Sequence, residues 1–387
     1  MSEPVDLTIL MPCLNEAETL ARCIEKAKLG LQRAGVRGEI VIADNGSTDG
    51  SQAIAEKAGV RLVPVKEKGY GNALRGGIAA ARGRWIIMGD ADDSYDFQEV
   101  PKFVEQLKAG YELVQGCRLP SGGGRVLPGA MPFLHRWWGN PMFSIMVRWW
   151  FHAPIHDVYC GLRGFTKELY LRLDQRCTGM EFATEMIIKA SLFRAKIAEV
   201  PITLHPDGRK AHAPHLKTFR DGWRTLRFFL IFSPRWLFLL PGFAMVLLGL
   251  VAYALALPAS TIKGITFDAH TLLFGSIFMI CGYQSILFAI FTKTFAVNEG
   301  LMPADKQFNA FYRVANLERG LMVALVGLVI GVGLLVAAVN EWRLAHFGHL
   351  DYAHTMRLVV PGVTLTALAF QTMLSSFFVS ILGMQRR

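Results

Sequence analysis

Four long apolar runs in the carboxyl-terminal part of the chain constrain its architecture more than any other feature. They cover approximately residues 236–257, 271–296, 320–339 and 358–382. A helix needs about 20 apolar residues to cross the hydrocarbon core of a bilayer. A helix buried inside a soluble protein seldom stays apolar on every face for that length. We therefore predict an integral membrane protein with a four-span transmembrane domain over residues 236–387.

The rest of the chain reads as a soluble sequence. The chain has 387 residues, of which 52% are hydrophobic, and the apolar excess lies after residue 235. This length accommodates a catalytic domain, expected over residues 1–205, and a basic segment over residues 206–235 that leads to the first span. Residues 1–6 lack the basic start and apolar run of a signal peptide, so none is expected.

Lysine and arginine predict the orientation of the spans, because they are retained on the cytoplasmic side. Three regions are basic. They are the segment before the first span, the loop between spans two and three, and the carboxyl-terminal tail. Their residues are Arg209, Lys210, Lys217, Arg220, Arg224, Arg227 and Arg235, then Lys306, Arg313 and Arg319, then Arg386 and Arg387. The other two loops offer only Lys263, and Arg343 with Arg357. The amino domain and both termini are therefore expected in the cytoplasm.

Charge and cysteine usage exclude two other classes of protein. The net charge of +10 is concentrated before the first span, which indicates anionic lipid headgroups as the partner and no nucleic acid. The six cysteines show no spacing of the zinc or redox type, so they are expected to be reduced.

Strand-like and helix-like segments alternate through the amino domain. The expected strands are residues 7–11, 39–43, 61–65 and 85–88, and the expected helices are residues 15–31, 71–81, and one capped by Ser47 or Thr48 that runs to about residue 58. This alternation predicts an α/β fold in which helices cover both faces of a mostly parallel sheet.

Polar residues follow three of these strands. They are Asn15 and Glu16, Asp44 and Asn45, and Asp90 and Asp92. Ligands of such sheets bind beyond the carboxyl ends of the strands. The carboxylates of Asp90-Ala91-Asp92 suit Mg²⁺ or Mn²⁺, with a diphosphate completing the coordination shell. Such a triplet taken alone is more often a capped loop, but its position after the fourth expected strand favours a metal site.

Three motifs in this order resemble those of the family 2 glycosyltransferases. They are Pro12-Cys13-Leu14-Asn15-Glu16, Asp44-Asn45-Gly46-Ser47-Thr48-Asp49 and Gly89-Asp90-Ala91-Asp92. Within that family, residues 5–235 are most similar to the polyprenyl-phosphate hexose synthases, which use dolichyl or undecaprenyl phosphate. The resemblance implies a GT-A nucleotide-sugar domain. It also implies that Pro12, Asn15, Glu16 and Asp44 hold the nucleoside, and that Asp90 and Asp92 hold the metal and the diphosphate.

Two positions depart from the family pattern. Asn45 stands where the family often has a second aspartate, and Ser94 stands where some relatives place a metal-binding glutamine. Both departures bear on the metal shell.

A later motif supplies candidates for binding an acceptor phosphate. Asp157-Val158-Tyr159-Cys160-Gly161-Leu162-Arg163 is similar to an Asp…Gly-x-Arg element of the family, and Arg118 begins a glycine-rich loop. Arginine donates two parallel hydrogen bonds to a phosphate, so Arg118 and Arg163 are the candidates. Asp157 is expected to orient the acceptor or balance charge. Glu181 is a second candidate carboxylate, or else a helix cap.

Two amphipathic stretches are expected to lie in the membrane interface. One, residues 216–230, carries Leu216, Phe219, Trp223, Leu226 and Leu230 at helical spacing, with Lys217, Arg220, Arg224 and Arg227 on a neighbouring face. The other, residues 131–151, contains four tryptophans, which favour that boundary. The alternative for the first stretch is a helix buried on the catalytic domain.

The resulting hypothesis is transfer of one hexose, with inversion and with a divalent metal, from a nucleotide sugar to polyprenyl phosphate. The nucleotide sugar is of the UDP-glucose or GDP-mannose class. A homo-oligomer is possible. One alternative is a transferase acting on a lipid hydroxyl such as diacylglycerol. Another is a processive polysaccharide synthase, although residues 133–137 lack the glutamine of its Gln-x-x-Arg-Trp element. A third, non-enzymatic, alternative binds nucleotide sugar and moves lipid.

Overall fold

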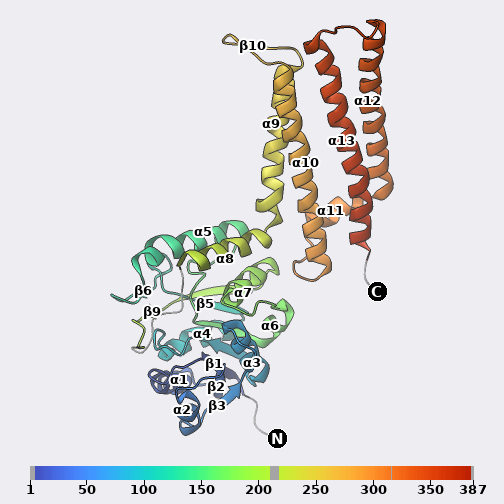
Figure 1. Ribbon diagram of the computed structural model, residues 1–387. Helices are drawn as coiled ribbons and strands as arrows, with labels where there is room; N and C mark the ends of the chain where they lie inside the picture. Colours follow the sequence, from blue (N-terminus) through green and yellow to red (C-terminus); the bar gives the residue numbers. More distant parts are fainter. Residues whose placement is uncertain (1–4, 210–217, 315, 385–387) are drawn as a thin grey trace. The chain divides into compact units, whose positions relative to one another are not determined.

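The computed structural model describes residues 5–209, 218–314 and 316–384 (Figure 1). The chain divides into two compact units, the first ending at Phe229 and the second beginning at Leu230. Four of the basic residues counted above, Lys210, Lys217, Arg386 and Arg387, lie outside the described residues, and so does Leu216.

A seven-stranded sheet forms the centre of the first unit. Its strands are β1 (Leu7–Cys13), β2 (Gly38–Asp44), β3 (Arg61–Pro64), β4 (Trp85–Met88), β5 (Leu113–Cys117), β7 (Arg163–Thr166) and β8 (Ile197–Pro201). Their spatial order is β3-β2-β1-β4-β7-β5-β8. All neighbours are parallel except β7, which runs antiparallel to β4 and to β5. A small parallel pair, β6 (Arg125–Val126) and β9 (Thr203–Leu204), lies apart from this sheet.

Helices cover both faces of the sheet, which confirms the predicted fold class. They are α1 (Leu20–Ala34), α2 (Ser51–Lys57), α3 (Tyr70–Ala80), α4 (Val100–Lys108), α5 (Asn140–Phe151), α6 (Lys167–Leu173), α7 (Glu181–Leu192) and α8 (Thr218–Ile231), with short turns η1 (Phe97–Glu99), η2 (Pro120–Gly122) and the π-helical η3 (His135–Gly139). The helices α1 and α4 pack on one face, and α3 and α6 pack on the other.

Successive side chains of β1 point to opposite faces of the sheet, so they pack into the hydrophobic layers on both faces. Ile9 and Met11 are fully buried in the cluster under α1 and α4, whereas Leu10 faces α3. A Cβ atom on Gly77 of α3 would lie 2.3 Å from Cδ1 of Leu10, so any larger residue would force the buried Leu10 side chain or the helix to shift. The small residues of this helix therefore set its distance from the sheet.

Two helix starts differ from the sequence prediction. The helix expected from residue 15 begins at Leu20, because Asn15 adopts a left-handed conformation with φ of 59°. The helix expected to be capped by Ser47 or Thr48 begins at Ser51, after Gly50. The Ser47 hydroxyl instead accepts a hydrogen bond from the Asn15 N–H at 2.9 Å. Residues expected to start the helices thus form loops at the sheet edge.

The helix α8 packs on α5 through a face that the sequence did not indicate. Phe229 is fully buried and makes edge-to-face contacts with Phe143 and Phe151 of α5, while Trp223 on the predicted apolar face is 61% exposed. The side chains of Phe219 and Arg220 lie outside the described residues. Phe229 therefore holds α8 on α5, and Trp223 does not.

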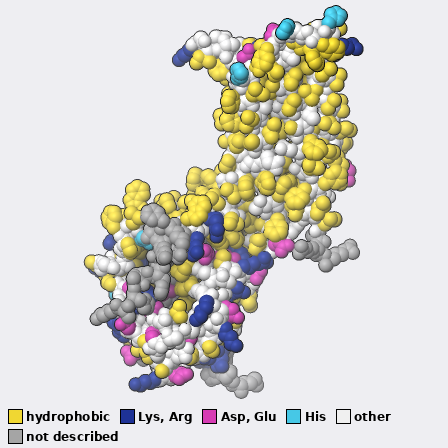
Figure 2. All heavy atoms as spheres, in the orientation of Figure 1, with side chains coloured by type: hydrophobic (Ala, Val, Ile, Leu, Met, Phe, Trp, Pro, Cys, Tyr) yellow, Lys and Arg dark blue, Asp and Glu magenta, His cyan; other side chains and the backbone are white. Residues whose placement is uncertain are grey.

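Large apolar side chains remain exposed around α5 and α8, and we call them the aromatic surface. They are Phe133, Leu134, Trp137, Trp138, Met142, Ile145, Trp149 and Trp223. Hydrophobic side chains gather over the edge of the first unit that carries α5 and α8 in Figure 2. A soluble monomer seldom exposes a contiguous patch of this kind, so the aromatic surface indicates an interaction site.

The second unit contains four helices that are long and apolar enough to cross a membrane, among the residues described. They span Arg235–Ala256, Ala269–Asn298, Leu317–Leu344 and Tyr352–Gly383. The first joins the π-helical η4 (Arg235–Leu239) to α9 (Leu240–Ala256), and the others are α10 (Ala269–Asn298), α12 (Leu317–Leu344) and α13 (Tyr352–Gly383). A hairpin of β10 (Thr261–Ile262) and β11 (Ile265–Thr266) follows α9, and the short α11 (Lys306–Val314) precedes α12.

Small residues and hydroxyl groups hold these helices together. Gly282 of α10 lies so close to α9 that an added Cβ atom would be 2.7 Å from the Gly242 carbonyl oxygen. The Tyr253 hydroxyl of α9 lies 2.7 Å from Ser276 Oγ of α10 and 2.9 Å from Thr364 Oγ1 of α13. Such contacts are how helices associate in lipid, where the hydrophobic effect between them is absent.

Candidate active site

The three sequence motifs meet at one edge of the sheet. Cys13 at the end of β1 is in register with Asp44 at the end of β2. Leu10 of β1 pairs with Met88, the last residue of β4, so Asp90 emerges at the same edge. The structure thus brings together the nucleoside and metal candidates that the sequence placed on separate strands.

Asp44 and Asn15 organise the loops that follow β1 and β2. Asp44 is almost fully buried and accepts hydrogen bonds from the Ser47 N–H at 3.2 Å and from Gln52 Nε2 at 2.7 Å. The Asn15 side-chain oxygen accepts one from the Thr48 N–H at 2.8 Å. These contacts fasten the first two motifs to each other.

Asn45 has a structural use that explains its departure from the family pattern. Its side-chain nitrogen donates to the carbonyl oxygens of Val65 at 3.1 Å and Glu67 at 2.7 Å, and its side-chain oxygen accepts from the Gly69 N–H at 2.8 Å. A carboxylate could not donate to those carbonyls. Asn45 therefore ties the second motif to the start of α3.

Asp90 and Asp92 are each held by a neighbouring hydroxyl. Tyr70, the first residue of α3, donates to Asp90 Oδ1 at 2.9 Å. The Ser94 hydroxyl donates to Asp92 Oδ1 at 2.6 Å, and its N–H donates to the same oxygen at 3.0 Å. Burial raises the pKa of Asp90 to about 6, and the nearby Asp92 carboxylate adds to the rise. Ser94, the second departure, thus orients a candidate metal ligand.

Arg209 is a site residue that the sequence analysis counted only as a basic flanking residue. Its Nη1 lies 3.0 Å from Glu16 Oε1, its Nη2 lies 3.2 Å from Asp92 Oδ2, and its Nε donates to Asp207 Oδ2 at 2.8 Å. Arg209 and Asp92 are 117 positions apart in the sequence. No short motif could have paired them.

The carboxylates fit a divalent cation only in part. Across residues 5–209, 218–314 and 316–384, no group of three histidine, cysteine, aspartate or glutamate side chains could by itself hold a metal. Asp90 and Asp92 nevertheless supply the oxygen ligands that hard cations prefer, and Asp92 already carries a cationic partner. They fit a metal whose shell a ligand diphosphate completes.

Arg118 and Asp157 form a buried pair. Arg118 Nε lies 2.7 Å and its Nη2 lies 2.8 Å from the two oxygens of Asp157, which also accepts from the Arg118 N–H at 3.0 Å. Asp157 is fully buried, and Arg118 is 8% exposed. The structure places Asp157 behind Arg118, where it orients the guanidinium, and not at an open surface.

The remaining nitrogen of Arg118 points toward the metal candidates. Its Nη1 lies 3.5 Å from the Tyr95 hydroxyl, which accepts a hydrogen bond from the Gly161 N–H at 2.8 Å. A Cβ atom on Gly161 would lie 2.8 Å from Asp90 Oδ2. Tyr95 and Gly161 therefore connect Arg118 with Asp90.

Arg163 is not brought to an open site. It is a fully buried residue of β7, and its guanidinium donates to the carbonyl oxygens of Cys160 at 2.8 Å and of Ala183. Burial lowers the pKa of Arg163. Carbonyl oxygens thus bind two of its guanidinium nitrogens, so the structure supports the prediction that Arg163 binds an acceptor phosphate less well than the same prediction for Arg118.

Glu181 and the six cysteines are the remaining residues singled out in the sequence analysis. Glu181 is the first residue of α7 and is half-buried, and no side chain caps that helix. All six cysteines are free thiols, as predicted. Burial raises the pKa of Cys13, the thiol next to the candidate nucleoside residues, to about 11, so it is protonated at neutral pH.

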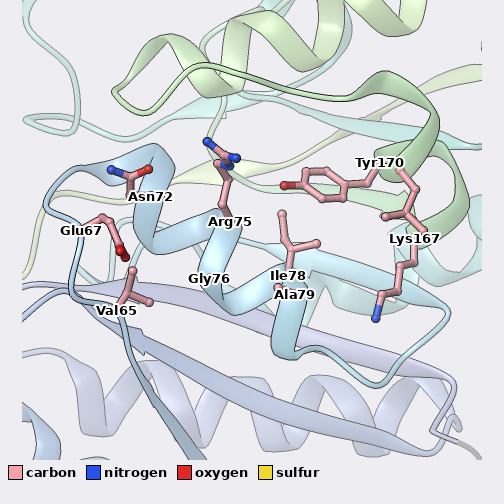
Figure 3. A pocket seen from close by; sticks show the side chains of 10 residues that line it. Val65, Glu67, Asn72, Arg75, Gly76, Ile78, Ala79, Lys167 and Tyr170 are labelled. Atoms are coloured by element: carbon pink, nitrogen blue, oxygen red, sulfur yellow. The ribbon is translucent and has the colours of Figure 1, made fainter.

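A separate cavity of about 450 Å³ lies beside α3 and α6. Figure 3 shows Arg75, Tyr170 and Lys167 on its wall, with Tyr170 pointing toward Arg75. Lys167 Nζ donates to the Ala81 carbonyl oxygen at 2.7 Å. None of the predicted site residues lines this cavity.

Comparison with known proteins identifies the class that this fold and site define. Residues 8–173 match glycosyl transferase family 2, and residues 290–383 match the glycosyltransferase family 2 C-terminal transmembrane region. The chain belongs to glycosyltransferase family 2. It is an integral membrane glycosyltransferase, as the sequence predicted.

Two relatives from Haloferax volcanii are similar to this chain, one over nearly its whole length and one over a little more than half of it. The low-salt glycan biosynthesis hexosyltransferase Agl6 is 35% identical over 379 residues, which cover 97% of this chain and 89% of that protein. A dolichyl-phosphate hexose transferase is 30% identical over 218 residues, which cover 56% of this chain and 89% of that protein. These relatives support a hexosyltransferase.

Among solved structures, a glucosyl-3-phosphoglycerate synthase from Mycobacterium tuberculosis in complex with Mg²⁺ and UDP is similar to the chain. The TM-score is 0.47 at 21% identity, and the match covers 58% of this chain and 79% of that one.

Proposed function

We propose that this hexosyltransferase moves one hexose from a nucleotide sugar to a polyprenyl phosphate at the cytoplasmic face of the membrane, with inversion. The observation that carries the proposal is the connection from Arg118 through Tyr95 and Gly161 to Asp90. It joins a cationic group suited to an acceptor phosphate with the carboxylates suited to a donor diphosphate. The similarity of the catalytic region to a dolichyl-phosphate hexose transferase supports the same acceptor class.

The donor would occupy the sheet edge formed by the first three motifs. In this proposal Pro12, Asn15, Glu16 and Asp44 bind the nucleoside of a UDP-glucose or GDP-mannose type donor. The hydrogen bonds of Asp44 fix this loop without a ligand, so the loop that would hold the nucleoside is largely formed in advance.

Asp90 and Asp92 would hold Mg²⁺ or Mn²⁺ together with the diphosphate. A bound metal of this kind neutralises the charge that develops on the leaving nucleoside diphosphate. Tyr70 and Ser94 each bind one oxygen of these carboxylates, so a metal would bind the other oxygen, which on Asp92 now faces Arg209.

The acceptor side would rely on Arg118, with Asp157 orienting it. A guanidinium held by a bidentate carboxylate presents its remaining N–H groups in a fixed direction. The acceptor phosphate is largely ionised near neutral pH and brings its own nucleophile, so Asp157 and Glu181 need not act as a base. Arg163 would support this region indirectly, because it binds the carbonyl of Cys160 next to Gly161.

The aromatic surface would place the catalytic unit against the membrane interface. Tryptophan and other large apolar residues favour that boundary, and Trp138 and Trp149 are 70% and 64% exposed. Together with the basic residues before the first span, this surface supports the interfacial role proposed for residues 206–235 and 131–151. The same charges support a cytoplasmic catalytic unit and cytoplasmic termini.

The test offers purified protein a panel of nucleotide sugars with either polyprenyl phosphate or diacylglycerol, and identifies the lipid product by mass spectrometry. We expect a hexosyl-phosphoryl lipid and its loss on addition of a chelator. Glycosylation of diacylglycerol with no product from polyprenyl phosphate would establish the hydroxyl-acceptor alternative. Chain growth beyond one hexose would establish a processive synthase.

A further inference from the structure

The Arg209 guanidinium lies against Asp92 and Glu16, two acidic residues that the proposed donor site uses. Ser94 engages Oδ1 of Asp92, and Arg209 Nη2 lies 3.2 Å from the other oxygen, Oδ2. The Nη1 atom of the same guanidinium lies 3.0 Å from Glu16 Oε1. The Arg209 side chain is 13% exposed, so these contacts are partly shielded from water.

The backbone around Arg209 is fastened to the same loop, which shows that the contact is part of the fold. The Gly208 N–H donates to the Asp92 carbonyl oxygen at 3.0 Å, and the His205 N–H donates to that of Ser94 at 2.9 Å. A Cβ atom on Gly208 would lie 2.9 Å from Cγ2 of Thr19, so only glycine fits without a shift. These backbone hydrogen bonds therefore hold residues 205–208 against the Asp92–Ser94 loop and place Arg209 next to Asp92 and Glu16.

We propose that Arg209 is an intrinsic counter-cation for Asp92 and Glu16 that a divalent metal must displace. The inference rests on the proposed function, because it takes Asp92 as a metal ligand. A bound Mg²⁺ lies about 2.1 Å from a carboxylate oxygen. The Arg209 nitrogen now on Asp92 Oδ2 would then face a doubly charged ion at short range, where like charges repel strongly.

Asp207 makes the exchange possible without leaving Arg209 unpaired. It accepts from Arg209 Nε at 2.8 Å, and its side chain is 28% exposed. A guanidinium that leaves Asp92 and Glu16 can therefore keep one carboxylate partner, which limits the cost of separating the charges. In this proposal, metal binding to Asp92 is coupled to release of Arg209 from Asp92.

The test measures Mn²⁺ binding to the full-length protein in the absence of donor, by electron paramagnetic resonance of the free ion. Arg209→Ala and Arg209→Gln remove the competing charge, and we expect both to bind Mn²⁺ about tenfold more tightly than wild type. Arg209→Lys keeps a cation and should remain within about threefold of wild type. The matched control is Arg22→Ala, because Arg22 pairs with Asp93, the residue next to Asp92, at 3.4 Å. It should leave Mn²⁺ affinity nearly unchanged.

The outcomes separate this inference from the proposed function. Equal or weaker Mn²⁺ binding by both neutral variants, with wild-type protein binding the ion, overturns the exchange and leaves the metal assignment standing. Equal tightening by Arg22→Ala also overturns it, because the effect would then be general electrostatics. If no variant binds Mn²⁺, even with a nucleoside diphosphate present, both the exchange and the metal assignment are wrong. A circular dichroism spectrum shows whether each variant is folded. If either Arg209→Ala or Arg209→Gln does not fold, the other still provides the test.

Discussion

Ser94 donates two hydrogen bonds to a single oxygen of Asp92, from its hydroxyl at 2.6 Å and from its N–H at 3.0 Å. This relationship gives the carboxylate a fixed orientation in which only Oδ2 faces a cation. Ser94, which stands where some relatives have a metal-binding glutamine, therefore supports a neighbouring candidate metal ligand.

Removal of the Ser94 hydroxyl should weaken metal binding without abolishing it. Ser94→Ala keeps the N–H contact and loses one charge-assisted hydrogen bond, which costs about 1 kcal/mol, or roughly fivefold in affinity. Ser94→Thr retains the hydroxyl and serves as the control. The metal concentration for half-maximal transfer reports the effect. Equal values for Ser94→Ala and wild type would show that Asp92 does not need this support.

Asp92 itself should be indispensable. Asp92→Asn should reduce hexosyl transfer on the order of a hundredfold or more, because metal stabilisation of the leaving group is worth several kcal/mol. Asp93→Asn is the matched control, since Asp93 is bound to Lys26 at 2.8 Å and stands outside the proposed shell. Initial rates of lipid product formation give the comparison. Full activity of Asp92→Asn, or wild-type activity in excess chelator, would contradict the metal assignment.

Metal binding should depend on pH through Asp90. Its pKa is raised to about 6 by burial and by Asp92, so the neutral form persists up to that pH and metal affinity should fall as the pH drops below 6. The Tyr70 hydroxyl opposes the rise, because its hydrogen bond favours the ionised carboxylate. Tyr70→Phe should therefore move the midpoint of Mn²⁺ binding to higher pH. A midpoint that is unchanged or lower would remove Tyr70 as a positioning residue.

Arg118 should govern use of the lipid phosphate. Arg118→Lys keeps the charge opposite buried Asp157 but loses the fork, so we expect the KM for polyprenyl phosphate to rise about tenfold while the donor KM stays within about twofold. Arg118→Ala is a less clear test, because it leaves a buried carboxylate unpaired. Steady-state kinetics with each substrate varied separately decide the matter. An equal rise in both KM values would move Arg118 to the diphosphate side.

The aromatic surface should matter only when the acceptor resides in a bilayer. Trp138→Glu with Trp149→Glu should lower transfer to polyprenyl phosphate in vesicles several-fold, since a charge at the interface opposes insertion of this face. Transfer to a short, water-soluble prenyl phosphate should remain near wild type. Leu171→Glu is the control, because Leu171 is 68% exposed on α6, outside the aromatic surface. Equal losses with both acceptors would indicate damage to the active site.

Much of the architecture follows from local patterns in the sequence. The four apolar runs predicted four long apolar helices, and the ends of the observed helices differ by a few residues because apolarity does not mark where a helix stops. The strand at residues 85–88 was predicted with its observed bounds, since β4 is buried along its whole length. The carboxyl ends of parallel strands lie at the same edge of a sheet, so Asp44 at the end of β2 and Asp90 after β4 were expected at one edge, where the structure has them.

Only the tertiary structure decided how charged side chains are paired. Arg118 and Arg163 look equivalent in the sequence, yet Asp157 orients one and backbone carbonyls enclose the other. Arg209 reads as one more basic residue before a membrane span, yet it lies against Asp92 from 117 positions away. Hydrophobic periodicity and motifs are local properties, so sequence alone determined the class of this enzyme and its spans. An ion pair depends on where distant backbone segments meet, and folding alone fixes that.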